Sequence, residues 1–243
     1  MEESGNTEAI VLKIKPYKEN DSLITVYSKD YGLLELLAKS IRKQGSKLSG
    51  HLNLLQQCKI LIINGKGFDY LSAAVSFNSF LAIRDDYDKV ICAQEIVKIF
   101  LNHVKENQKE EDLYFLLENY LQAINDDQEF SDDKSLIYKL KFILSFIKIN
   151  GYLPELFNCL KCKKKLEKGN NYFDFLNGGV ICLNCYESIK NKESINNILT
   201  ISDKTVILLR YFLNRNINQK IVINKKNLQE TYKIAQKFLL FIN

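Results

Sequence analysis

The sequence predicts an α+β fold, in which a small β-barrel is followed by a domain made mainly of helices. Three observations lead to this prediction: short apolar runs between turn residues up to residue 80, helical spacing of apolar residues beyond it, and two Cys-x-x-Cys pairs within the helical part. We expect two domains, residues 1–80 and residues 81–243, with an insertion that carries the cysteines at about residues 155–190.

Five apolar runs in the first domain have the length and the turn boundaries of β-strands. They cover residues 7–15, 22–28, 33–38, 54–63 and 68–77. We expect Pro16 to end the first strand, and the sequence Asn64-Gly65-Lys66-Gly67 predicts a hairpin between the last two. Five short strands indicate a small barrel or a sandwich. A partly open Greek-key barrel of this size would be an OB-fold, a common platform for single-stranded nucleic acid.

Apolar residues beyond Phe80 recur every three or four positions, which predicts helices at residues 86–105 and 110–124. A third helix is expected to begin at an N-cap, Ser131, and to end before Gly151. Two more helices are expected after the cysteines, one capped at residues 200–203 and one over residues 228–242. The insertion is therefore flanked by helices on both sides.

Four cysteines form two pairs, Cys159 with Cys162 and Cys182 with Cys185, and nineteen residues separate the pairs. This spacing is typical of a site that holds Zn²⁺ with two thiolates from each of two turns. All four ligands would then come from the protein, which leaves no open position and indicates one structural ion rather than a catalytic one. A disulfide pair, or a site that has lost its metal, would use the same cysteines. The complete prediction is an N-terminal five-stranded OB-fold barrel followed by an all-helical domain that carries an inserted four-cysteine zinc ribbon.

Charge is unevenly distributed along the chain, although its net value is only +5. The net charge is +2 over residues 1–80, −9 over residues 81–133, +7 over residues 134–192 and +5 over the remainder. A strongly acidic segment therefore separates two basic ones, and we expect the two kinds of surface to meet different partners.

The stretch from Leu36 to Phe68 contains no acidic residue. Its candidates for phosphate contacts are Lys39, Arg42, Lys43, Lys47 and Lys66. Most of them lie in a loop that we expect to be flexible and rich in small hydrogen-bonding residues, as a phosphate-binding segment requires. A solvated loop without a ligand would have the same composition. Nearby aromatic residues fit either core packing or base stacking; these are Tyr17, Tyr27, Tyr31, Phe68 and Tyr70.

Several classes of protein find no support in the sequence. There is no GxxxxGK[ST] phosphate loop, no GxSxG and no HExxH, and only two histidines occur, so we expect a protein that is not an enzyme. No apolar run is long enough to span a membrane. The acidic, polar N-terminus does not resemble a secretory signal, so we expect a cytoplasmic location.

The order of these parts resembles the bacterial RecO family of recombination mediators. Ala9-Ile10-Val11-Leu12 and the Glu19-x-Asp21 turn are similar to the family's opening, and Lys39-Ser40-Ile41-Arg42 is similar to its Lys-Gly-x-Arg segment. Ser40 departs from the glycine that is usual in the family. Gly151-x-x-Pro154 before the first cysteine pair and Gly178-Gly179 before the second also resemble the family's lead-in segments.

The resemblance implies a DNA-repair factor of the RecF pathway that binds single- and double-stranded DNA and anneals complementary strands. Together with RecR, such a factor helps to load RecA onto DNA coated by the single-strand-binding protein SSB, and we expect it to be associated with the nucleoid. It implies that the basic residues of the barrel contact phosphates, and that the helical domain binds the acidic C-terminal tail of SSB. Arg210 and Arg215 are our candidates for that tail.

Two other functions fit the same residues. One is a zinc-stabilised adaptor that binds only proteins through its acidic helical face, and the other is an OB-fold factor for RNA. Binding of single-stranded DNA and of RNA at two salt concentrations distinguishes the three functions.

Overall fold

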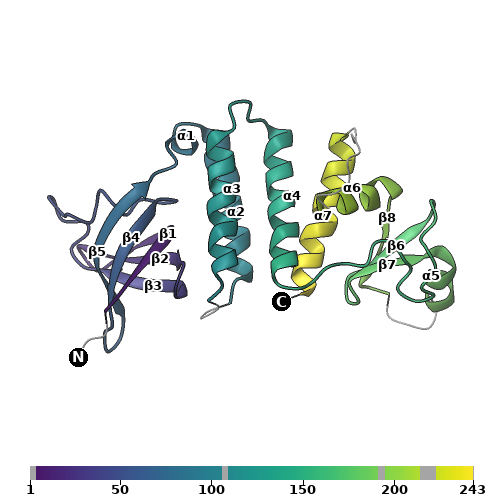
Figure 1. Ribbon diagram of the computed structural model, residues 1–243, viewed down its shortest axis with the longest axis horizontal. Helices are drawn as coiled ribbons and strands as arrows, with labels where there is room; N and C mark the ends of the chain where they lie inside the picture. Colours follow the sequence, from purple (N-terminus) through teal and green to yellow (C-terminus); the bar gives the residue numbers. More distant parts are fainter. Residues whose placement is uncertain (1–3, 106–108, 191–194, 214–222, 243) are drawn as a thin grey trace. The chain divides into compact units, whose positions relative to one another are not determined.

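The computed structural model describes residues 4–105, 109–190, 195–213 and 223–242 (Figure 1). The chain divides into two compact units, Met1–Phe130 and Ser131–Asn243. The predicted class is confirmed: a closed barrel, then helices, then a ribbon that carries the four cysteines between helices. The first compact unit contains the first helices as well as the barrel. The expected boundary at residue 80 marks instead the change from strands to helices. That boundary stays a prediction.

Five strands form the barrel, in the order β1-β2-β3-β5-β4, and β4 closes it by pairing with β1. Every pair is antiparallel except β3 with β5. The long connection between β3 and β4 produces this parallel pair, because the chain must cross one end of the barrel before β4 begins. The strands are β1 Ser4–Tyr17, β2 Asp21–Ser28, β3 Gly32–Ala38, β4 Gln57–Ile63 and β5 Asp69–Asn78.

Two strand boundaries differ from the prediction. Pro16 does not end β1, because it pairs with Ser22 at the end of the β1–β2 hairpin, where a missing N–H group is tolerated. β4 begins three residues later than expected, because Leu55 has a left-handed backbone (φ 66°). The Leu55 N–H donates instead to the carbonyl of Val11 (2.8 Å), so the chain turns here before it joins the sheet.

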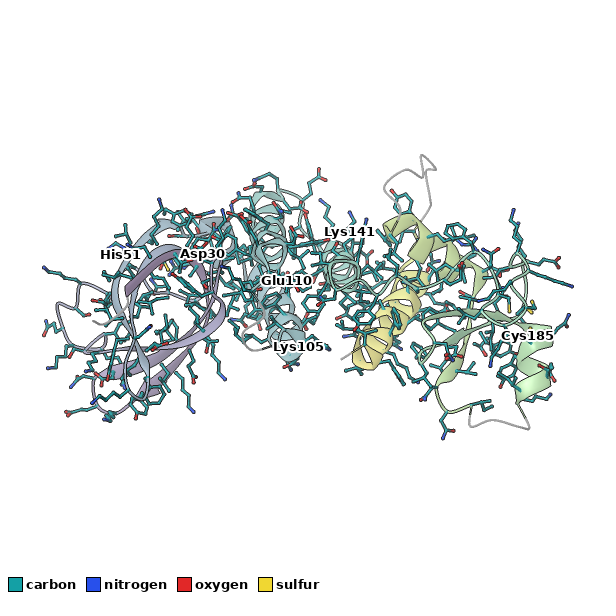
Figure 2. All side chains as sticks on the ribbon, turned by 60° about the horizontal axis from the view of Figure 1, so that its bottom comes forward. Asp30, His51, Lys105, Glu110, Lys141 and Cys185 are labelled. Atoms are coloured by element: carbon teal, nitrogen blue, oxygen red, sulfur yellow. The ribbon has the colours of Figure 1, made fainter. Side chains whose placement is uncertain are left out.

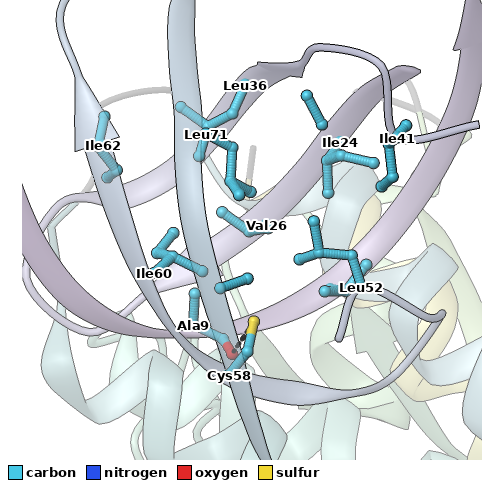
Figure 3. Close-up of a cluster of buried hydrophobic side chains, with 13 residues drawn as sticks. Ala9, Ile24, Val26, Leu36, Ile41, Leu52, Cys58, Ile60, Ile62 and Leu71 are labelled. Carbon is cyan, nitrogen blue, oxygen red and sulfur yellow. Dashed lines mark hydrogen bonds between the residues drawn. The ribbon is translucent and has the colours of Figure 1, made fainter. Parts of the chain in front are cut away.

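Alternate residues of the strands point into the barrel and form one cluster of buried side chains (Figure 3). The β3–β4 connection contributes Ile41 and Leu52 to this cluster, so it is packed onto the barrel at two points. Cys58 lies in the same cluster, with its Sγ 3.8 Å from the carbonyl oxygen of Ala9. Burial raises the pKa of the Cys58 thiol to about 12.

We expect Cys58 to resist alkylation by iodoacetamide at pH 8 while the protein is folded. The thiolate is the reacting form, and the raised pKa keeps this thiol neutral well above pH 8. The neutral thiol also stabilises the fold below pH 9, and this stability is lost as the pH rises towards 12. Peptide mapping after labelling, with and without 8 M urea, measures the protection. Rapid labelling of Cys58 in the native protein would contradict the buried position.

Three helices complete the first compact unit. They are α1 Leu81–Arg84, α2 Tyr87–His103 and α3 Glu111–Asp126. Asp86 caps α2, and its carboxylate accepts the N–H groups of Asp88 and Lys89. Polar side chains join α3 to the barrel: Gln57 donates to Glu118 Oε1 (2.8 Å) and to the Tyr114 hydroxyl (3.3 Å). These buried contacts explain why the barrel and the first helices form one unit.

The second compact unit combines three longer helices with a ribbon that contains a small sheet and one short helix. The longer helices are α4 Asp132–Ile149, α6 Asp203–Leu213 and α7 Lys225–Phe241, and α4 packs against the other two. Ser131 caps α4 as predicted, and its hydroxyl accepts the Lys134 N–H. Across the part of the chain that the structure describes, no helix combines the length and the apolar character that crossing a membrane requires.

The ribbon lies in the sequence between α4 and α6. It consists of β6 Asn171–Asp174, β7 Gly179–Cys182, α5 Leu183–Ile189 and β8 Ile198–Ile201, with the strand order β7-β6-β8. The third strand lies beyond residue 190, at the segment where we expected only the cap of the next helix. Phe173 of β6 contacts Phe238 of α7 (ring centroids 5.4 Å apart), so the sheet packs directly on the helices.

Candidate metal centre and nucleic-acid interface

The four predicted cysteines meet at one point of the ribbon. Their sulfur atoms all lie within 4.8 Å of one another, and those of Cys162 and Cys182 are 4.0 Å apart. Cys185 follows Cys182 in the first turn of α5 (Figure 2). Four sulfurs arranged tetrahedrally at 2.3 Å from a zinc ion are about 3.8 Å from one another. The cluster therefore has the dimensions of a tetrahedral metal site.

Backbone hydrogen bonds shape the first cysteine turn. The Lys163 N–H donates to the carbonyl of Cys159 (2.9 Å), and the Cys159 N–H donates to the carbonyl of Lys164 (2.8 Å). Lys163 has a left-handed backbone (φ 60°), which closes the turn. The segment before this turn lies against β7 at Gly179, where a Cβ atom would lie 2.7 Å from the carbonyl oxygen of Glu155. This close approach explains the second glycine of the Gly-Gly sequence before the second cysteine pair.

The ionisation of the thiols also favours a bound cation. Burial raises the pKa of Cys159, but N–H groups of Cys162, Cys182 and Lys161 outweigh this effect and lower the pKa to about 6. One of them, the Cys182 N–H, lies 3.4 Å from Cys159 Sγ. Burial and the neighbouring thiols raise the pKa of Cys185 to about 12. Four thiolates so close together repel one another, and a divalent cation removes that repulsion when it binds. The residues present therefore fit a metal ion.

The same cysteine turn carries a run of basic residues. All five of its lysines are exposed, and a single exposed acid, Glu167, lies among them. These lysines are Lys161, Lys163, Lys164, Lys165 and Lys168.

The structure exposes every basic residue that we predicted to contact phosphate on the barrel. Four of them lie on the β3–β4 connection and one lies on the β4–β5 loop; they are Lys39, Arg42, Lys43, Lys47 and Lys66. Whether they bind nucleic acid stays a prediction.

The β3–β4 connection, which we expected to be a flexible loop, is a series of hydrogen-bonded turns. The Ser40 N–H donates to the carboxylate of Asp21 (2.7 Å), and the Arg42 N–H donates to the carbonyl of Asn20 (3.0 Å). Ser40 has a left-handed backbone (φ 55°), which is the conformation that glycine favours. The serine therefore adopts the shape expected of the glycine that is usual in related sequences.

His51 fixes the far part of this connection to the barrel (Figure 2). Its Nδ1 accepts the backbone N–H of Ser76 in β5 (3.3 Å) and lies 3.0 Å from the Ser76 hydroxyl. His51 thus connects a loop to a strand of the barrel. The basic side chains are thus displayed from a backbone that is held at both ends.

The five candidate aromatic residues separate into two groups. Tyr27 is fully buried against Phe100 (ring centroids 4.8 Å apart), so this ring has a structural role. Tyr31 is exposed, and its hydroxyl lies close to Gly5 at the start of β1. The other three are exposed or half-buried near the two loops at one end of the barrel; they are Tyr17, Phe68 and Tyr70.

Sequence reasoning missed one cation at this end of the barrel. Lys18 lies in the β1–β2 turn, and its Nζ is 5.4 Å from the centre of the Tyr17 ring. The sequence feature that could have identified Lys18 is its position next to Tyr17.

Arg210 has contacts within its own unit. Its Nε donates to the carbonyl of Leu156 (3.0 Å), and its guanidinium lies 4.7 Å from the centre of the Phe157 ring. Burial lowers the pKa of this guanidinium. Arg215 lies outside the described residues. The assignment of these two arginines to an acidic tail therefore stays a prediction.

The barrel and the cysteine cluster together define the class of this molecule: an OB-fold protein whose helical part carries a metal-binding ribbon. Comparison with known families identifies one family within this class. The chain belongs to the recombination protein O family, since the family described as "Recombination protein O N terminal" matches residues 1–80 and "Recombination protein O C terminal" matches residues 84–241. This is a family of DNA-repair and recombination proteins.

Curated relatives agree with the family assignment. The chain is 30% identical over 226 residues to a protein of Dehalococcoides mccartyi named "DNA repair protein RecO", covering 92% of this chain and 85% of that protein. Proteins of the same name from Thermodesulfovibrio yellowstonii and from Thermoanaerobacter sp. are both 28% identical to it. The first of these alignments covers 98% of this chain and 92% of the relative, and the second covers 85% and 79%.

Proposed function

We propose that this chain is a non-enzymatic recombination mediator that binds single- and double-stranded DNA and anneals complementary strands. The observation that carries the proposal is a group of exposed cations on the β3–β4 connection, a segment that contains no acidic residue; they are Lys39, Arg42, Lys43 and Lys47. Each phosphate that such a surface neutralises releases a condensed counterion, which favours binding at low salt.

Annealing follows from the same chemistry and requires no catalytic residue. Cationic side chains reduce the repulsion between two strands and raise their effective concentration. The exposed lysines of the cysteine turn provide a second cationic surface, on the other compact unit. A chain with two such surfaces can hold two strands at once, and base pairing between the strands completes the reaction.

We further propose that the cysteine cluster binds one Zn²⁺ ion with a structural role. The four thiols provide a complete tetrahedral set of soft ligands, which Zn²⁺ prefers. When bound, the ion would join the first cysteine turn to β7 and α5. Its role would be to hold the ribbon together, and the contact with DNA would belong to the lysines.

The proposed partners are those of the family: RecR, the C-terminal tail of SSB and, indirectly, RecA. In this proposal the protein acts in the cytoplasm, with the nucleoid, and helps to transfer DNA from SSB to RecA. Membership of a recombination and DNA-repair family supports these steps.

A titration of labelled single-stranded DNA tests the proposal directly. An RNA of the same sequence serves as the comparison, both ligands are measured at 50 and 200 mM salt, and the DNA titration is repeated with an SSB tail peptide. We expect DNA binding that weakens steeply with salt, together with faster annealing of a complementary pair of labelled strands. Absence of binding would favour a protein adaptor, and a clear preference for RNA would favour the RNA-binding alternative.

A further inference from the structure

Two loops meet at one end of the barrel and bring aromatic rings together. Tyr17 ends β1, Phe68 ends the β4–β5 loop, and their ring centroids are 5.7 Å apart in an edge-to-face arrangement. Phe68 is 36% exposed although it is an apolar ring, and Tyr17 is half-buried. The contact therefore joins the loops while it leaves ring surface open to solvent.

Two lysines lie close to aromatic rings at this end of the barrel. Lys18 lies over Tyr17, and Lys39 Nζ lies 4.2 Å from the centre of the Tyr70 ring. The parallel pairing of β3 with β5, which places Leu37 beside Tyr70, brings Lys39 close to this ring. Lys66 is exposed on the same loop as Phe68.

A glycine fixes the shape of the β4–β5 loop. A Cβ atom at Gly65 would lie 2.1 Å from the carbonyl oxygen of Phe68 and 2.6 Å from the Tyr70 ring. Only a residue without a side chain permits this close approach, so the loop is held against Tyr70. The rings are therefore positioned before any ligand arrives.

These rings do not complete the barrel core. The core is filled by the buried cluster of strand residues, to which neither Tyr17 nor Phe68 belongs. Exposed rings interleaved with lysines provide what unpaired nucleotides need: a flat apolar surface for the base and an ammonium group for the adjacent phosphate.

We propose that Tyr17 and Phe68 form a base-stacking subsite that makes the barrel selective for unpaired bases. Lys18 and Lys39 would contact the phosphates on either side. In a duplex both faces of each base are covered by its neighbours, so a duplex reaches only the cationic side chains. This inference rests on the proposed function, since it assumes that the barrel binds nucleic acid, and it adds the origin of selectivity for single strands.

Replacing Phe68 by alanine tests the subsite. We expect the affinity for single-stranded DNA to fall roughly tenfold, because stacking on an aromatic ring contributes that much per base. The affinity for duplex DNA and the salt dependence of both should stay unchanged, because no charge is removed. Phe68→Tyr should retain single-strand affinity. Phe77→Ala, which removes an exposed ring near the far end of β5, serves as the matched control.

An abasic strand provides an independent measurement. The wild-type protein should bind it more weakly than the normal strand, and Phe68→Ala should cause no further loss on it. Suppose that the wild-type protein binds DNA. If Phe68→Ala then weakened binding of single strands and duplexes equally, or weakened neither, the subsite would be overturned while the proposed function stands. If the wild-type protein bound no nucleic acid, the proposed function would fail and the subsite with it.

The close approach at Gly65 yields a separate prediction about stability. Gly65→Ala should lower the urea midpoint of the first compact unit by roughly 1 M, because backbone and ring must move to admit the new methyl group. Gly67→Ala in the same loop is the control, since a Cβ atom there meets nothing within 4 Å. Urea unfolding followed by circular dichroism measures both variants. Equal stability of the two would show that the β4–β5 loop can relax.

Discussion

Cys159→Ser is expected to abolish metal binding and to unfold the ribbon. Cys159 is the buried ligand of the four, and its sulfur also accepts the backbone N–H of Cys182. A serine hydroxyl is neutral at pH 7 and binds Zn²⁺ poorly, so three thiolates would remain. Structural zinc sites bind their ion with roughly 10–16 kcal/mol, which is comparable with the whole stability of a domain.

The loss of folded structure in Cys159→Ser should extend beyond the cysteine cluster. β6 places Phe173 against Phe238, so an unfolded ribbon would expose apolar surface on α7 as well as its own. We therefore expect low solubility in addition to the absence of metal. Elemental analysis should find about one zinc per wild-type chain and almost none in the variant.

Lys164→Ala is the matched control for this variant. It lies in the same turn and its side chain is exposed, while the hydrogen bond that it makes to Cys159 uses the backbone carbonyl. Zinc content should stay at one ion per chain. A purified wild-type protein without zinc would reject our proposal for the site, and a metal of another kind would correct its identity.

The cysteine cluster could be predicted from sequence because the information for it is local. Two Cys-x-x-Cys pairs at a suitable separation identify the four candidate ligands, and the structure brings together the same four sulfurs. The longer helices α2 and α4 could be predicted in the same way, since each begins at a polar capping residue and continues with apolar residues at helical spacing. In both cases neighbouring residues determine the outcome.

The parts that the sequence did not reveal depend on contacts between distant segments. β8 joins the ribbon sheet by pairing with β6, although the run at 198–201 has only four residues and leads directly into a helix. Strand alternation could not separate buried Tyr27 from exposed Phe68, because closure of the barrel and the packing of α2 determine which ring is covered. The order of the turns in the β3–β4 connection likewise depends on Asp21 and Asn20, in a different hairpin.

Arg42→Ala combined with Lys43→Ala is expected to weaken binding of single-stranded DNA roughly 10- to 30-fold at 0.1 M salt. The substitution removes two exposed cations and leaves the connection in place. The backbone N–H groups of both residues keep their partners, the carbonyls of Asn20 and Ser40, and Ile41 remains anchored in the barrel. The loss of affinity would therefore report lost phosphate contacts rather than a rearranged loop.

The salt dependence of binding tests for lost phosphate contacts more stringently than the affinity at one salt concentration does. The slope of log K against log salt is negative, and each phosphate contact contributes about 0.7 to its magnitude for a single strand. Two lost contacts therefore make the slope shallower by about 1.4. Lys98→Ala combined with Lys105→Ala is the matched control, because it removes the same charge from two exposed positions on and just after α2. An equal change in slope for both pairs would mean that net charge alone attracts the strand. A change confined to Arg42 and Lys43 would place the phosphate contacts on the β3–β4 connection, because only a local contact releases its counterions independently of the total charge of the protein.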